Sequence, residues 1–179
     1  MSFAIERLSA DPAIVAALAE ILVETVAHGG SVSFMHPLSR ADAEAFWRAH
    51  LAAPGNVVLG AHDAGALVAT VTLHCVGWPN QPHRAEIAKL MTRVVDRGRG
   101  AAAALMAEAE RRARAQGRTL ITLDTAEDDG AGGFYERLGY ERVGRIEGYA
   151  LRPLGGLTAT VIYCKQVGAA DAPRVRREA

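Results

Sequence analysis

A glycine-bearing turn between a strand-like run and an alanine-rich segment is the part of this sequence best suited to chemistry. The turn, residues 97–102, reads Arg-Gly-Arg-Gly-Ala-Ala. Glycine allows close backbone approach and positive φ, so successive N–H groups at the start of a helix can converge on one anion. Arg97 and Arg99 add positive charge beside them. The turn therefore predicts a site for a diphosphate group, although joints between strands and helices also carry Gly and Arg without any ligand.

Two carboxylates interrupt apolar segments and are candidates for acid–base work on an amine. Glu86 lies in the strand-like run 85–94, and Asp124 follows the apolar residues 120–123. A carboxylate at a strand end attracts an ammonium group, and a neighbouring carboxylate that raises its pKa lets it accept a proton. His83 is an alternative base, because imidazole titrates near neutral pH. Ordinary salt bridges are the other interpretation of both carboxylates, with three basic residues as available partners: Arg84, Lys89 and Arg93.

Motifs of several other catalytic classes are missing from the sequence. There is no Gly-Lys-Ser/Thr phosphate loop and no GxGxxG followed by the expected acidic residue, which argues against an NTPase or a Rossmann dehydrogenase. No HExxH or paired Cys/His spacing is present, so no metal site is expected. The serines lack a nucleophile-elbow motif. Cys75 and Cys164 lie in apolar segments, where we expect buried thiols without a catalytic role.

Length and composition indicate an ordinary globular domain. The chain has 179 residues, 50% hydrophobic and 22% charged, with 20 basic and 20 acidic side chains. This balance favours neither nucleic acid nor a membrane surface as a partner. No charged-then-apolar leader and no run near ~18 apolar residues is present, so we expect a cytoplasmic protein. Residues 1–168 are expected to form one domain and residues 169–179 a flexible tail.

The N-terminal part of the chain predicts a short strand and two helices. Residues 2–8 alternate like a strand, and Asp11-Pro12 then offers a helix cap with proline in the first turn. Apolar residues at helical spacing continue to the Gly29-Gly30 stop. Ser39 or Asp42 can cap a second helix that ends at Pro54-Gly55. The residues of this helix expected to face inward are Ala45, Phe46 and Leu51.

The remainder of the chain alternates strands and helices, which predicts a mixed α/β sheet. The segments 57–61 and 67–76 flank a turn and form a hairpin. The central strand 85–94 leads through the turn into a helix over 100–116, which Gly117 closes. The expected elements after it are a strand over 119–125, a short helix over 133–138, and two final strands over 140–148 and 158–166.

Several of these segments resemble one known superfamily. Residues 97–102 fit Arg-x-x-Gly-x-Ala, which resembles the acetyl-CoA signature of the GCN5-related N-acetyltransferase (GNAT) superfamily. Phe134-Tyr135-Glu136-Arg137-Leu138-Gly139-Tyr140 resembles its FYxxLGY segment, and residues 86–91 fit the strand before the cofactor loop. The likeness covers residues 84–145. Three shorter segments, 79–86, 123–125 and 148–150, are similar to the subgroup that contains the tabtoxin-resistance acetyltransferases.

The resemblance implies a fold and a co-substrate. The implied fold has a mixed central sheet that splays where acetyl-CoA enters, flanked by helices. The residues implied to bind acetyl-CoA are Met91, Thr92, Val94, Arg97, Gly98, Arg99, Gly100, Ala101, Ala102 and Asp128. Three of them depart from the family pattern: Thr92 replaces an aliphatic residue, Val94 a proline, and Asp128 an asparagine that contacts the pantetheine. The last change replaces a donor with an acceptor.

The resemblance also implies a reaction. Tyr135 matches the tyrosine that protonates the departing thiolate, although an aromatic residue there also fits a core position on an amphipathic helix. With Glu86 and Asp124 it makes up the implied catalytic set. The implied activity is direct transfer of an acetyl group in a ternary complex to the amine of a small molecule, with toxin or antibiotic detoxification suggested by the subgroup. The alternatives are an acyl-CoA-binding module without turnover, a longer acyl-CoA, or a peptide or protein amine. A homodimer through the C-terminal strands is also expected.

Overall fold

The computed structural model describes residues 3–168 of the chain, so the tail predicted over 169–179 lies outside the described residues. The seven strands are β1 (Ala4–Arg7), β2 (Asn56–Asp63), β3 (Ala66–Cys75), β4 (Arg84–Thr92), β5 (Leu120–Ala126), β6 (Glu141–Leu151) and β7 (Leu157–Gln166). The α-helices are α1 (Pro12–Ala27), α2 (Arg40–Ala52), α3 (Ala101–Ala115) and α4 (Gly132–Arg137). Two short 3-10 turns, η1 (Val94–Asp96) and η2 (Glu127–Asp129), follow β4 and β5.

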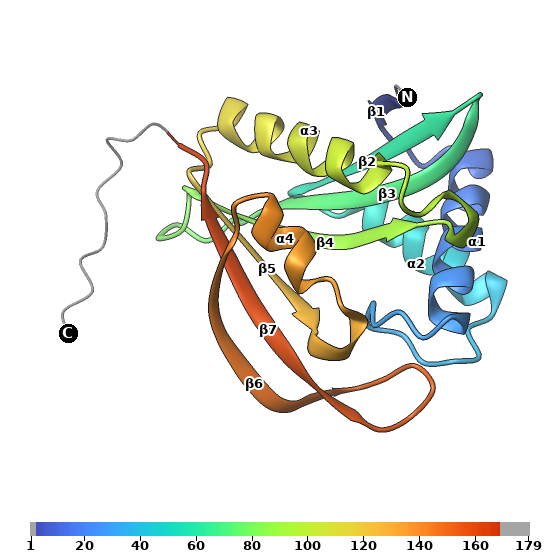
Figure 1. Cartoon of the computed structure of the whole chain (residues 1–179). Coiled ribbons are helices and arrows are strands. Elements are labelled where there is room, and N and C mark those ends of the chain that lie inside the picture. Colours follow the sequence, from blue (N-terminus) through green and yellow to red (C-terminus); the bar gives the residue numbers. More distant parts are fainter. Residues whose placement is uncertain (1–2, 169–179) are drawn as a thin grey trace.

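All seven strands form one mixed sheet in the order β1-β2-β3-β4-β5-β7-β6, which confirms the predicted fold class (Figure 1). Its neighbours are antiparallel except β4 and β5, which run parallel. Side chains alternate between the two faces. Val57 and Leu59 of β2 join the core under α3 and α4, whereas Val58 joins the core under α1 and α2. The helices therefore cover both faces of the sheet, as burial of two apolar faces requires.

Local signals in the sequence place both N-terminal helices correctly. The Asp11 carboxylate accepts hydrogen bonds from the N–H groups of Ala13 (2.8 Å) and Ile14 (3.4 Å), so it caps α1 as predicted. Of the two caps considered for α2, Ser39 is the one that accepts the N–H of Asp42 (3.0 Å).

The inward face predicted for α2 is partly wrong. Ala45 is exposed, and the fully buried side chains of this helix are Ala43 and Trp47. These two residues are four positions apart and so lie on one face. Phe46 and Leu51 are half-buried beside them and pack against the same core.

The central strand is shorter than predicted, because it ends at Thr92 and residues 94–96 form a 3-10 turn. The Arg93 N–H still donates to Val68 of β3 (2.9 Å), but the next N–H, that of Val94, donates to the Glu24 carboxylate of α1 (3.2 Å). The chain therefore turns away from the sheet before the predicted end. The final hairpin is longer than predicted: β6 reaches Leu151, with an irregular register between Ile146 and Ala150.

The parallel pair β4–β5 is very short, and this opens the sheet. Residues 84–86 pair with residues 120–122, after which β4 continues beside β3 and β5 beside β7 (Figure 1). A register shift opposite residues 70–72 places a bulge in β4, where Lys89 has a φ of 52°. Such a φ is uncommon for a residue other than glycine, and a bulge bends the strand that contains it.

Within residues 3–168 no helix is long and apolar enough to cross a membrane.

Candidate active site

The opening between β4 and β5 holds a cavity of about 910 Å³. Its walls come from five parts of the chain: the end of α1 with the α1–α2 connection, β4, the loop that enters α3 with the first residues of that helix, the end of β5 with the segment through α4, and the tip of the β6–β7 hairpin. Hydrogen bonds tie the α1–α2 connection to two other walls. The Ser31 N–H donates to the Asp129 carboxylate between β5 and α4 (3.1 Å), and the His36 N–H donates to the Pro153 carbonyl at the hairpin tip (3.0 Å). Segments far apart in the sequence therefore enclose one space.

One end of this cavity is the N-terminus of α3. Gly100 caps the helix with a φ of 94° and offers no side-chain hydrogen bond, so the first N–H groups of a 15-residue helix are open to the cavity. Gly98 has a φ of 76°, and a Cβ atom at either glycine would meet nothing within 4 Å. Arg97, Ala101 and Ala102 line the same end. The arrangement fits a diphosphate, since uncapped amides and a helix dipole favour an anion here.

Two residues predicted to bind the cofactor lie outside the cavity wall. Arg99 forms ion pairs with Asp63 of β2 (2.5 Å) and with Asp96, so its guanidinium ties the loop to the β2–β3 hairpin. The Val94 N–H is engaged by Glu24. Both residues hold the shape of the loop, and their direct contact with a ligand stays a prediction.

The wall beside this loop is the free edge of β4. Met91 and Thr92 line the cavity, and beyond Glu86 the β5 side of the strand pairs with no other described strand. An extended ligand can add to such an edge through backbone hydrogen bonds without any particular side chain. On the opposite wall Asp128 accepts a hydrogen bond from the Thr158 hydroxyl (3.1 Å) and lies 3.6 Å from the Arg152 guanidinium.

Tyr135 of α4 lies at the inner wall of the cavity. Its side chain is 7% exposed and packs against Phe134, Tyr140 and Tyr163, and no hydrogen bond from another residue in 3–168 engages its hydroxyl. Burial, with a contribution from the Asp124 charge, raises the pKa of Tyr135 to about 12. The phenol is therefore neutral at pH 7 and can donate its proton. The two interpretations of Tyr135, core aromatic and proton donor, are compatible in this position.

A buried ion pair fixes the short helix that carries Tyr135. Lys165 of β7 donates to both oxygens of Glu110 (2.8 Å each) and to the Leu138 carbonyl at the end of α4 (2.6 Å). The Glu110 side chain is only 8% exposed. At the other end of α4, the Tyr163 hydroxyl lies 2.6 Å from where a Cβ atom of Gly132 would be, so only glycine fits there.

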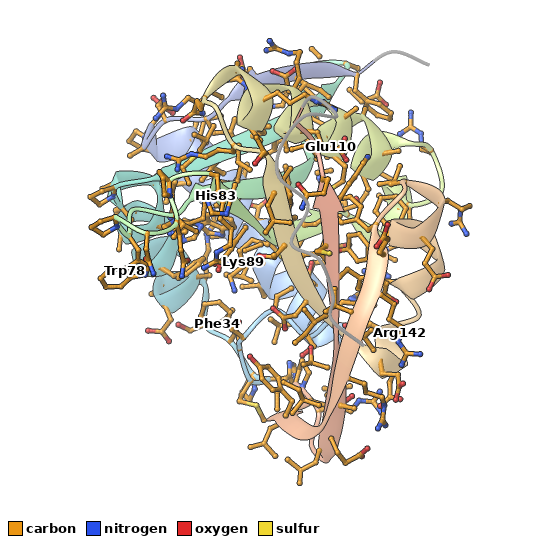
Figure 2. The ribbon with its side chains drawn as sticks, turned by 90° about the vertical axis from the view of Figure 1, so that its left-hand side faces the viewer. Phe34, Trp78, His83, Lys89, Glu110 and Arg142 are labelled. Atoms are coloured by element: carbon orange, nitrogen blue, oxygen red, sulfur yellow. The ribbon has the colours of Figure 1, made fainter. Side chains whose placement is uncertain are left out.

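The two predicted carboxylates are placed differently. Asp124 is exposed and lines the cavity, and one of its oxygens accepts a hydrogen bond from the Thr160 hydroxyl (3.0 Å). Glu86 lies at the last pair before the strands separate, outside the cavity wall, and its carboxylate is ion-paired with Arg84 (2.5 Å). His83 is exposed and also lies outside that wall (Figure 2).

Lys89 is a wall residue that the sequence analysis treated only as a salt-bridge partner. Its ammonium donates to the Val32 carbonyl (2.8 Å) and the Ser33 hydroxyl (3.1 Å), and lies 5.7 Å from the ring centres of Phe34 and Phe46 (Figure 2). Burial lowers the pKa of Lys89, and the Asp124 charge opposes this. One feature of the sequence could have indicated a functional role for Lys89, namely a lysine within an apolar strand. Nothing in the sequence indicated that the strand bulges at this residue.

A hydrogen-bonded chain lies behind Lys89. His50 is bonded to the Thr72 hydroxyl (2.9 Å), and Asn56 lies between His50 (3.3 Å) and His74 (2.7 Å). Burial, together with the charges of Lys89 and His74, lowers the pKa of His50 to about 4. His50 is therefore neutral at pH 7 and supplies no counter-charge to its surroundings.

Of the two cysteines, Cys75 is buried and donates to the Gln116 amide oxygen (3.4 Å), while Cys164 is half-buried in β7. Neither lines the cavity. Cys75 is therefore buried as expected, whereas Cys164, which was also expected to be buried, is only partly so.

Solved structures with the same architecture are numerous and distant in sequence. An acetyltransferase of Salmonella typhimurium, assigned by inference and solved with its cofactor acetyl-CoA, is 16% identical with a TM-score of 0.77 over 98% of this chain and 100% of its own. An inferred phosphinothricin N-acetyltransferase is 18% identical, with a TM-score of 0.76 over 93% and 99% of the two chains. A ribosomal-protein-alanine N-acetyltransferase from Brucella melitensis is 16% identical, with a TM-score of 0.76 over 91% and 99%.

At these identities the likeness shows a shared fold. The family is shown by the sequence itself, because the family model described as "Acetyltransferase (GNAT) family" matches residues 18–140, a span that contains the α1–α2 wall, β4, the glycine-bearing turn and α4. The chain therefore belongs to the GNAT family of acetyltransferases.

Proposed function

We propose that this protein transfers the acetyl group of acetyl-CoA to the amine of a small molecule, directly and within a ternary complex. The observation that carries the proposal is that one cavity joins the uncapped N-terminus of α3 to Tyr135 and Asp124. Family membership and the acetyl-CoA bound to the Salmonella protein support the choice of co-substrate. A thiol-release assay with acetyl-CoA and a panel of amines tests the proposal, which fails if no amine releases CoA above the hydrolysis background.

The residues present fit acetyl-CoA as a substrate. In this proposal the turn 97–102 binds the diphosphate, and the free edge of β4 around Met91 and Thr92 pairs with the pantetheine arm. Asp128, which accepts from Thr158, stands where the family has an amide, so its contact with pantetheine needs a donor on the ligand.

The acid–base groups have separate tasks in the transfer. The amine nitrogen loses a proton to Asp124, directly or through water, and forms a bond to the thioester carbonyl carbon. When the carbon–sulfur bond breaks, the thiolate takes the hydroxyl proton of Tyr135. Because burial raises the pKa of Tyr135 to about 12, the phenol stays protonated for this step, and the same burial makes the thiolate more basic.

The proposal leaves the largest choice in the identity of the amine that accepts the acetyl group. The name of one structural neighbour specifies phosphinothricin and that of another a ribosomal protein alanine, so one fold serves both small and macromolecular amines. We favour a small amine, in keeping with the tabtoxin-resistance subgroup, because the hairpin tip and the α1–α2 connection meet over the cavity through His36 and Pro153. The amine panel repeated with longer acyl-CoA thioesters tests the longer acyl donor, and a binding module without turnover predicts no CoA release with any of these thioesters.

Gly100→Val is expected to weaken CoA binding by tenfold or more. The φ of 94° at Gly100 is strained for a β-branched residue, so the turn must change where the diphosphate binds. Gly117→Val is the matched control: it also has a positive φ (69°) and open space, but it lies at the far end of α3. Calorimetry with CoA on both folded variants is the measurement. Equal affinity in the two variants would contradict the placement.

Tyr135→Phe is expected to lower kcat by ~10²–10⁴-fold while CoA affinity stays near wild type, since only the proton donor is removed. Tyr140→Phe removes a hydroxyl from another neighbouring ring, whose centre lies 6.0 Å from that of Tyr135, and should leave kcat unchanged. Since Tyr135 stays protonated up to a pKa of about 12, wild-type kcat should show no alkaline decline from this group below pH ~10. Full activity of Tyr135→Phe would show that Tyr135 does not donate the proton to the thiolate.

Asp124→Asn is expected to raise the KM of the amine, because a carboxylate meets the ammonium in the cavity. Glu86→Gln should have a smaller effect, since Glu86 is ion-paired with Arg84 outside the cavity wall. Steady-state kinetics between pH 6 and 9 compare the two. A larger effect of Glu86→Gln than of Asp124→Asn would show that Glu86, and not Asp124, is the carboxylate that meets the amine.

We also propose a homodimer through the C-terminal hairpin. β6 is an edge strand of the sheet and exposes a row of large apolar side chains with its hairpin: Val143, Ile146, Tyr149, Leu151 and Leu157. The double variant Val143→Lys, Ile146→Lys should shift the mass in light scattering from dimer to monomer. Trp78→Lys, a change at another exposed apolar residue, is the control. A monomeric wild type at every concentration would end the proposal.

A further inference from the structure

Lys89 is a half-buried cation in the wall of the cavity. Of the 20 basic residues only two are lysines, Lys89 and Lys165, and both are half-buried. Lys165 is neutralised by the buried Glu110 carboxylate. Lys89 takes part in no ion pair within the part of the chain that the structure describes. Of these two lysines, Lys165 therefore forms an ion pair among the described residues, and Lys89 does not.

The partners of the Lys89 ammonium are neutral. It donates to the Val32 carbonyl and the Ser33 hydroxyl, and the rings of Phe34 and Phe46 lie beside it. An ammonium has three N–H donors, and the described residues engage two of them through hydrogen bonds. A half-buried charge without a counter-ion is costly, and that cost is removed when a bound anion supplies the missing charge. Lys89 lines the cavity, so such an anion can come from the substrate.

The other basic side chains at this wall have partners or another place in the proposal. The Arg152 guanidinium lies 3.6 Å from Asp128, and the His28 ring is hydrogen-bonded to the Glu24 carbonyl (2.8 Å). Arg97 lies at the α3 end, where the diphosphate is proposed to bind. Lys89 is thus the cation of this wall that is available to a second ligand.

An opposite charge faces the same cavity from the other strand. Asp124 of β5 lines it, and one oxygen of its carboxylate is used by Thr160 while the other has no hydrogen-bond partner among the described residues. Because β4 and β5 separate after residues 86 and 122, a cation on one strand and an anion on the other are held apart with space between them. Charges arranged in this way attract a molecule that carries both signs.

We propose that the acceptor is a small zwitterion of the amino-acid type, whose amine faces Asp124 and whose carboxylate or similar oxyanion binds the Lys89 ammonium and the Ser33 hydroxyl. This inference rests on the proposed function and specifies its substrate class. Lys89 is then a residue that determines specificity, and it takes no part in bond making or breaking. The Ser33 hydroxyl, which accepts from Lys89, keeps its own proton to donate to the anion.

The test compares each of several free α-amino acids with its own amide, which keeps the amine and the side chain but lacks the negative charge. Wild type and Lys89→Met are assayed for thiol release with both members of each pair. The ratio of kcat/KM for acid and amide should fall by about 10- to 100-fold in Lys89→Met, as expected for loss of a hydrogen bond to a charged group. Comparing ratios cancels the intrinsic reactivity of the two amines.

Two further variants separate recognition from structure. Arg111→Met removes an exposed charge from α3, where the side chain is 66% exposed, and should leave the ratio unchanged. Lys89→Arg keeps the charge and should keep most of the preference. An equal loss with acid and amide in Lys89→Met would mean that Lys89 only holds the α1–α2 connection, and an unchanged ratio would mean that it recognises nothing. Either result overturns the inference while the proposed function stands.

Failure of the proposed function has a different signature. In that case no amine of either kind releases CoA, and calorimetry decides the inference separately: the amino acids, titrated into protein saturated with CoA, should bind wild type at least tenfold more tightly than Lys89→Met. Equal binding would overturn the inference. The CoA affinity of Lys89→Met, measured in the same experiment, should match wild type and shows that the variant is folded.

Discussion

The structure depends on one interruption, the end of β4–β5 pairing after the pair Glu86–Thr122. Backbone groups of a strand are normally satisfied by both neighbours, so a strand that leaves its partner must bond to something else. Here the outer edges stay paired, β4 with β3 and β5 with β7, and only the inner edges are released. The rest of the sheet therefore stays paired around the opening. The opening itself exposes a free strand edge inside the fold, where an extended substrate can pair.

What surrounds the opening is fixed by contacts remote from it. The helix that carries Tyr135 is six residues long, too short to be stable alone. It is held at its C-terminal end by Lys165, whose charge is balanced by Glu110 of α3, and at its N-terminal end by the close approach of Tyr163 to Gly132. A hydroxyl proton donor is useful only if its position is reproducible. A buried ion pair gains little net stability, but it allows few alternative arrangements, and at this place that restriction positions the hydroxyl of Tyr135, the proposed proton donor.

Sequence analysis succeeded where the signal is local. The caps of α1 and α2, the turn 97–102 and the α4 segment depend on residues a few positions apart, and the structure has them where they were expected. It was less accurate where the cause is distant: β4 ends early because Glu24 of α1 takes the next N–H. The error in α2 is local, since Ala43 and Trp47 set the buried face of the helix and Ala45 is exposed. Arg99 carried the expected charge, yet its ion-pair partner Asp63 lies 36 residues earlier in the chain, in the β2–β3 hairpin. Lys89 was hidden for the same reason, since its neighbours come from the α1–α2 connection and α2.

The same reasoning connects the bulge in β4 to selectivity. A regular strand would direct alternate side chains to opposite faces, and Lys89 would follow the alternation of its neighbours. The positive φ at Lys89 breaks that pattern, and the ammonium meets the carbonyl of Val32 instead of a carboxylate. The bulge thus lies just beyond the point where β4 leaves β5, and it places an ammonium without an ion-pair partner among the described residues beside the opening. If the zwitterionic acceptor is correct, the distortion that makes room for the reaction also selects the molecule that enters it.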